Sequence, residues 1–224
     1  MNILAIDCAC EVLSVALAAG NGIFYMEIDA AFRHSELLME CADTLCKTAG
    51  ISPGDLDLVA CMKGPGSFTG LRIGYSSAKG IAMALEIPLR AVPTMDCLAR
   101  HLSIWPGIAV PAIDAKRSCF FAALYRNGKE LAGCMDVPPQ AIAEKIAAAR
   151  LSQDEKVVLT GPGAELLFPG LETYISGITL DPDCRKGRAR ELLEITKSRL
   201  PEETNDIDFG PVYLRKSDAE EKRR

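Results

Sequence analysis

The feature that most constrains the fold of this chain is an internal repeat. Ala5-Ile6-Asp7 matches Ala112-Ile113-Asp114, and at the same offset Ala16-Leu17 matches Ala123-Leu124. In each copy an apolar run that ends in aspartate precedes a second apolar run, an Asn-Gly turn and a third run. Because this order of elements occurs twice, the sequence predicts a duplicated pair of α/β lobes, which we place at residues 1–105 and 106–224.

Helical and extended patterns fill in the rest of each lobe. The stretch "HSELLMECADTLCKTA" has helical spacing that ends at Gly50, and "LDLVACM" reads as a strand. A glycine-rich turn follows, then a helix that is expected to end near Leu85. The first lobe therefore reads β-β-β-α-β-α-β-α. The second repeats β-β-β-α-β and adds one late helix at "RARELLEITKSRL".

Composition limits the classes of function. The net charge of −5 is unfavourable for a protein that binds nucleic acid alone. The start of the chain lacks a basic leader, and no long apolar stretch is without charge, so we expect no membrane span. The nine cysteines, an odd number, suit a reducing cytoplasm, and two histidines are too few for a histidine-rich metal site. We therefore expect no metal and no cofactor.

The stretch "KGPGSFTGLRIG", Lys63–Gly74, has the composition of a phosphate-binding loop. It lacks the lysine of a Walker loop, and its glycine comes one residue late for a dinucleotide fingerprint. We favour a strand-to-helix turn, with Ser67 or Thr69 capping the helix. A vestigial phosphate site remains the alternative, and its residues would be Asp7, Gly64, Gly66 and Asp114.

Small residues recur along one face of the helix that follows this turn. Gly70, Gly74 and either Ser77 or Ala78 lie on this face at spacings of three and four, and the larger Ile81 continues it. Such a face permits close approach by another element. That element is either the parent sheet or another protein, and the spacing leaves both possibilities open.

Several stretches make the chain resemble the TsaB family, bacterial proteins needed to make threonylcarbamoyladenosine in tRNA. They are "ILAIDCACEVLSVALA", "RHSELLMECADTLC", "KGPGSFTGLRIGYSSAKGIAMAL", "IPLRAVPTMDCLA", "AVPAIDAKR" and "PVYLRK". The resemblance implies an α/β fold of two ribonuclease-H-like lobes, as in actin-like ATPases, with the second lobe reduced. One departure is Cys8-Ala9-Cys10, where the family usually carries hydroxyl residues.

The resemblance also implies a non-catalytic role. The chain would be a scaffold subunit for modification of tRNA position 37, paired with a TsaD-type transferase and joined by a TsaE-type ATPase. Alone it could form a homodimer, and tRNA would be reached through the complex. The positions of the transferase's metal ligands fall on Thr94 and Leu98, of which leucine has no donor atom. The alternatives are a stand-alone actin-fold ATPase or phosphotransferase, and a peptidase.

We place the expected partner interface on two helices of the first lobe. Its residues are Leu37, Leu38, Cys41, Leu45, Gly70, Leu71, Gly74, Tyr75, Ala78 and Ile81. On this hypothesis Gly74→Arg abolishes pairing and leaves the isolated fold intact. Candidate basic contacts to tRNA are Lys116, Arg117, Arg185, Lys186, Arg188 and Arg190.

Overall fold

The computed structural model describes residues 1–31, 33–199 and 205–215, and these form two compact units. The first unit combines residues 1–97 with the described residues from 187 onward, and the second covers residues 98–186. These bounds differ from the expected 1–105 and 106–224. The reason is that the late helix packs on the first sheet, so the end of the chain returns to the first unit.

The first unit is built on a five-stranded sheet whose order is β3-β2-β1-β4-β5. Pairing is antiparallel between β1 and β2 and between β2 and β3, and parallel from β1 to β4 to β5. The strands are β1 (Ile3–Asp7), β2 (Val12–Ala19), β3 (Gly22–Asp29), β4 (Leu58–Gly64) and β5 (Leu89–Pro93).

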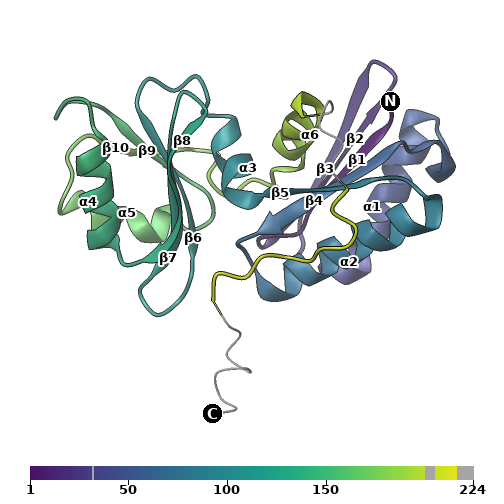
Figure 1. The fold of residues 1–224 in the computed structure, drawn as a ribbon, viewed down its shortest axis with the longest axis horizontal. Coiled ribbons are helices and arrows are strands. Elements are labelled where there is room, and N and C mark those ends of the chain that lie inside the picture. The colour runs from purple at the N-terminus through teal and green to yellow at the C-terminus, as the bar shows by residue number, and fades with distance from the viewer. Residues whose placement is uncertain (32, 200–204, 216–224) are drawn as a thin grey trace, which may run out of the picture. The chain divides into compact units, whose positions relative to one another are not determined.

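Helices cover both faces of this sheet, because β1 and its neighbours are apolar on both sides. On β1, Leu4 and Ile6 pack with α1 and α2, whereas Ile3 and Ala5 pack with α6. Figure 1 shows the helices of this unit beside its sheet. The helices of the unit are α1 (His34–Ala49), α2 (Phe68–Leu85) and α6 (Ala189–Ser198), and a 3-10 turn lies at Pro53–Asp55. Helix α3 (Thr94–Arg100) crosses the boundary between the units.

The second unit repeats the same sheet, with the order β10-β9-β6-β7-β8. Its elements are β6 (Ile108–Asp114), β7 (Phe120–Arg126), β8 (Lys129–Val137), α4 (Pro139–Ala149), β9 (Val157–Thr160), α5 (Ala164–Glu172) and β10 (Ile178–Leu180). Each element of one sheet has its counterpart in the other, with the same parallel and antiparallel pairings. The repeat predicted from the sequence is confirmed, and both sheets have the strand order of a ribonuclease-H-like lobe.

Two elements of the second unit have no counterpart in the sequence prediction. Helix α5 contains Pro169 and Gly170, and both residue types are unfavourable inside a helix. Strand β10 has only three residues, too few to show a hydrophobic period.

Among the described residues, no helix has both the length and the apolar character that a membrane span requires.

Candidate functional site

Asp7 lies at the end of β1 and is 4% exposed. Its Oδ1 accepts a hydrogen bond from the Ala9 backbone N–H at 3.0 Å. Its Oδ2 accepts one from the Arg188 backbone N–H at 2.8 Å and one from the Ser14 hydroxyl at 3.4 Å. The Ser14 oxygen in turn accepts from the Ala189 N–H at 3.0 Å. The two side chains therefore cap the N-terminus of α6, which satisfies N–H groups that a helix leaves unpaired.

The environment of Asp7 sets opposing effects on its titration. Burial raises the pKa of the carboxyl above its ordinary value, and the hydrogen bonds from Arg188 and Ala9 offset part of this rise. The Asp7 carboxylate is thus held by backbone groups of its own unit, in an arrangement suited to fixing α6 on the sheet.

The glycine turn after β4 packs against its own chain. A Cβ atom on Gly66 would lie 2.5 Å from the Ala9 carbonyl oxygen, and the Ser67 N–H donates to that oxygen at 2.7 Å. A Cβ on Gly64 would lie 2.5 Å from the Val212 carbonyl oxygen. Of the two predicted capping residues, Ser67 accepts from the Gly70 N–H at 3.3 Å. The structure thus gives the turn the packing role that we favoured over a ligand site.

Asp114 holds the matching position at the end of β6 in the second unit. Its carboxylate accepts hydrogen bonds from the Lys116 ammonium at 2.6 Å and the Lys116 backbone N–H at 2.7 Å. Partial burial works to raise the pKa of Asp114, but the bonds from Lys116 outweigh it and hold the pKa below its ordinary value. Because Asp7 and Asp114 belong to different units, a site that joins them stays a prediction.

The two histidines occupy separate structural positions. His34 is the first residue of α1 and is buried. His101 follows α3, and its Nε2 lies 2.7 Å from Asp181 Oδ2, which also accepts from the Thr160 hydroxyl at 2.6 Å. The chain positions that match the transferase's metal ligands, Thr94 and Leu98, are both buried. Over the described ranges, no three His, Cys, Asp or Glu side chains gather as a metal site would require.

The His101–Asp181 pair predicts a specific acid sensitivity. Burial works to raise the pKa of Asp181, but the bonds from His101 and Thr160 outweigh it and lower the pKa from 3.8 to about 2. The Asp181 carboxylate therefore binds a proton more readily in the unfolded chain than in the folded one. The ionised carboxylate contributes fully to stability above pH 3.8, and this contribution is lost as pH falls through about 2. We expect Asp181→Asn to remove about 2 kcal/mol of this pH dependence of the free energy of unfolding.

Urea unfolding of the wild type and of Asp181→Asn between pH 2 and pH 5 checks this expectation. Asp183→Asn is the matched control, because its carboxylate is exposed and lies two residues away. Parallel pH curves for the wild type and Asp181→Asn would contradict the assignment.

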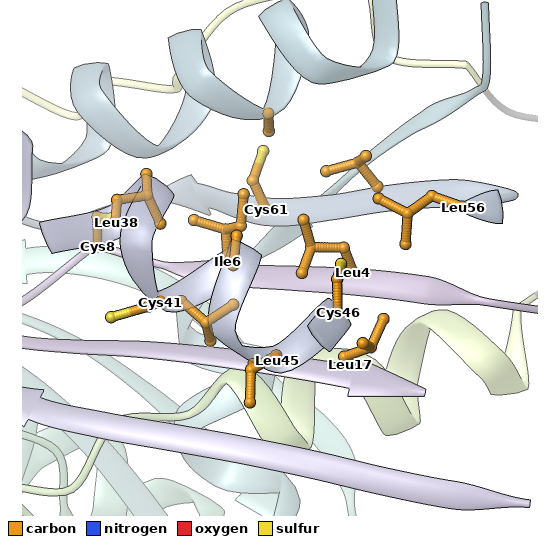
Figure 2. Close-up of a cluster of buried hydrophobic side chains, with 14 of the residues drawn as sticks. Leu4, Ile6, Cys8, Leu17, Leu38, Cys41, Leu45, Cys46, Leu56 and Cys61 are labelled. Carbon is orange, nitrogen blue, oxygen red and sulfur yellow. The ribbon is translucent and has the colours of Figure 1, made fainter. Parts of the chain in front are cut away.

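The residues expected at a partner interface lie mostly in the core of the first unit (Figure 2). The buried ones are Leu38, Cys41, Leu45, Gly70, Leu71, Gly74, Tyr75 and Ala78, and the partly buried ones are Leu37 and Ile81. Figure 2 shows the α1 side chains among Leu4, Ile6 and Cys61 of the sheet. The spacing allowed these side chains to pack either on the parent sheet or on another protein. The buried ones pack on the parent sheet.

One consequence is a correction to the Gly74→Arg expectation. A Cβ on Gly74 would lie 3.2 Å from the Cys8 Cβ, so an arginine side chain would have to enter the core. The expectation that this variant keeps an intact fold is wrong. An interface on these helices stays a prediction, and it must use the outward faces of α1 and α2.

Those outward faces differ in charge. On α1 the exposed side chains include Glu36, Glu40 and Met39. On α2 they include Arg72 and Met83, the latter 61% exposed. The α1 face thus carries carboxylates, and the α2 face carries a guanidinium with apolar surface.

Most of the candidate basic contacts to tRNA already take part in ion pairs. Arg188 is buried and pairs with Glu191 at 3.5 Å. Further pairs are Lys116–Asp114, Arg185–Glu165 and Lys186–Asp183. Both Arg117 and Arg190 lie at exposed positions. Contact of tRNA with these residues stays a prediction.

A segment near the end of the chain, residues 205–215, packs on the first unit, and we call it the C-terminal strap. The sequence did not predict its contacts. In Figure 1 it is the yellow stretch that runs beside α2. The Asp206 N–H donates to the Leu89 carbonyl at 2.8 Å, and the Asp206 carboxylate accepts from the Ala91 N–H at 2.8 Å. The Asp206 carbonyl accepts a third bond, from the Tyr75 hydroxyl at 2.9 Å. The strap therefore covers the edge strand β5, whose N–H groups would otherwise be unpaired.

The far half of the strap contacts the start of α2. The Val212 N–H donates to the Lys63 carbonyl at 2.8 Å, and the Tyr213 ring stacks on Phe68 with centroids 4.1 Å apart. Arg72 Nε lies 3.2 Å from the Tyr213 hydroxyl. The only signal for this contact in the sequence was the "PVYLRK" stretch, which does not say what it packs against.

Comparison with known proteins places these observations in a family. Residues 27–221 match the family model described as TsaD: tRNA N6-adenosine threonylcarbamoyltransferase. The tRNA threonylcarbamoyladenosine biosynthesis protein TsaB of Escherichia coli (strain K12) is 29% identical over 225 residues, which cover 98% of this chain and 96% of that protein. The protein of the same name from Bacillus subtilis (strain 168) is 35% identical over 131 residues, 57% of each chain.

Solved structures agree on the fold. YeaZ from Pseudomonas aeruginosa superposes with a TM-score of 0.79 at 22% identity, covering 95% of this chain and 99% of that one. A ROK family protein from Streptococcus pneumoniae TIGR4 superposes with a TM-score of 0.51 at 11% identity, covering 90% of this chain and 100% of that one. The fold is therefore that of the actin-like ATPases, with two ribonuclease-H-like lobes.

Proposed function

Since this chain belongs to the TsaD family of tRNA N6-adenosine threonylcarbamoyltransferases and is of the TsaB type, we propose that it is a non-catalytic scaffold subunit in tRNA threonylcarbamoyladenosine biosynthesis. It pairs with a TsaD-type transferase, and a TsaE-type ATPase joins the pair. In this role it works in the cytoplasm, and tRNA position 37 is modified on the partner.

The observation that carries this proposal is the set of hydrogen bonds to the Asp7 carboxylate. The carboxylate accepts bonds from Ala9, Ser14 and Arg188, and so serves as the cap of α6. A magnesium-nucleotide site would need these oxygens to face the metal or its waters. The turn at Gly64–Gly66 supports the same conclusion, because it packs on Ala9 and Val212. Asp7, Gly64 and Gly66 thus have structural contacts within the first unit. This supports a subunit whose partner carries out the catalysis.

The surface proposed for pairing is the outward face of α1 and α2. Exposed Met39 and Met83 supply apolar area, and Arg72 and Glu40 supply charges of both signs. Methionine and arginine are both enriched at protein interfaces. The same face can pair with a second copy when the transferase is absent.

Reconstitution tests the proposal. The purified chain is mixed with the TsaD-type transferase and TsaE-type ATPase of the same organism, threonylcarbamoyl-adenylate and unmodified tRNA, and the modified nucleoside is measured by mass spectrometry. We expect formation of the modified nucleoside to require this chain. Calorimetry of the chain alone with magnesium and ATP should show no binding.

Two outcomes would overturn the proposal. Full modification without this chain would remove its role as a required subunit. Tight ATP binding with turnover by the chain alone would instead favour the stand-alone ATPase.

A further inference from the structure

We propose that the Arg72 guanidinium is a preorganised binding site for a carboxylate of the partner protein, and that the C-terminal strap sets its position. This inference rests on the proposed function, since it assigns the residue by which the outward face of α2 recognises the transferase. It also gives the strap a role beyond covering the edge of the sheet.

The position of Arg72 is fixed from two sides. Its guanidinium carbon lies 4.4 Å from the centroid of the Phe68 ring, one turn earlier on α2, and 5.7 Å from the centroid of Tyr213 in the strap. Its Nε lies 3.2 Å from the Tyr213 hydroxyl. The two rings are themselves stacked, with an angle of 15° between their planes. The side chain is thus held in one place although Arg72 is exposed.

This arrangement leaves the outer donors of the guanidinium for a ligand. The hydrogen bond to Tyr213 uses Nε, and among the described residues no hydrogen bond or ion pair is formed by the two Nη nitrogens of Arg72. Two parallel N–H donors match the two oxygens of a carboxylate. Because the arginine is already ordered by the stack, binding costs little side-chain entropy, which is the condition for a strong interface anchor.

The surroundings favour a protein carboxylate over an RNA phosphate. The strap residues near Tyr213 expose apolar side chains, with Val212 and Leu214 each 43% exposed and Phe209 63% exposed. The neighbouring α1 face carries Glu36 and Glu40, and the chain has a net charge of −5. A phosphate backbone is attracted by a field of several cations. Among the described residues, the carboxylates of α1 work against such a field. Protein interfaces are enriched in arginine, and their buried centre is more apolar than the rest of the surface.

The test measures the affinity of the chain for the TsaD-type subunit of the same organism by calorimetry. Arg72→Lys keeps the charge but loses the fork, and Tyr213→Phe keeps the stack but loses the hydroxyl that orients Nε. We expect Arg72→Gln to weaken binding about a hundredfold, Arg72→Lys about tenfold and Tyr213→Phe a few-fold. Lys145→Gln, which removes one exposed charge from α4 of the second unit, should leave the affinity unchanged. Thermal unfolding of each isolated variant should match the wild type, because Arg72 is exposed.

The outcomes separate this inference from the proposed function. If the wild type fails to bind the transferase, the proposed function fails. If the wild type binds and Arg72→Gln binds equally well, only the role of Arg72 is overturned. A defect of Arg72→Gln that is seen only with tRNA present would identify a phosphate as the ligand and overturn the carboxylate. A change in self-association without a change in transferase affinity would identify a second copy as the partner.

Discussion

Replacing Gly70 by alanine is expected to destabilise this protein by about 3 kcal/mol, although alanine is the better helix former. A Cβ on Gly70 would lie 2.0 Å from the Cys8 carbonyl oxygen, which belongs to the loop after β1. That oxygen is backbone and cannot rotate away, so α2 would have to move off the sheet. The free energy of unfolding, measured by urea titration with circular dichroism, checks the prediction.

Gly80→Ala is the matched control in the same helix. No atom lies within 4 Å of a Cβ placed there, so alanine meets open space. The lower backbone entropy of the unfolded chain should then stabilise the protein by about 0.5–1 kcal/mol. Equal changes in the free energy of unfolding for the two substitutions would contradict the close packing of α2 at Gly70.

Asp7→Ala should cost about 3 kcal/mol or more of stability. The substitution leaves the N–H groups of Ala9 and Arg188 and the hydroxyl of Ser14 without their acceptor in a buried place. Unpaired buried donors cost about 1–3 kcal/mol each, and relief from burying a charge offsets part of that sum. Thermal and urea unfolding measure the loss.

The matching aspartate of the second unit provides the control for Asp7. Asp114 is partly exposed and bonds mainly to Lys116, so Asp114→Ala should cost about 1 kcal/mol or less. Nucleoside formation at a temperature where both variants are folded gives a second readout, and both should support it as the wild type does. Loss of that activity in a stably folded Asp7→Asn protein would indicate a metal ligand instead of a helix cap.

Much of the architecture was predictable because it depends on local patterns. Gly50 ends α1 in a left-handed conformation with φ of 70°, as its place after a helical period predicts. Of Ser67 and Thr69, the two predicted capping residues, Ser67 caps α2. The repeated order of strand, aspartate, strand and turn gave the two sheets, because each element has its own period and its own stop signal.

What only the tertiary structure decided is the neighbour that each face meets. The small-residue face of α2 has the same sequence whether it lies on a sheet or on a partner, and the structure places it against Cys8. Likewise nothing local says that α6 returns to the first unit, where Asp7 receives it, or that Tyr213 stacks on Phe68. These contacts join residues far apart along the chain, so they depend on packing and not on any period that a sequence displays. The sequence by itself therefore determined most of the elements, with α5 and β10 as the exceptions. The tertiary structure decided that the side chains expected to meet a partner instead hold the first unit together.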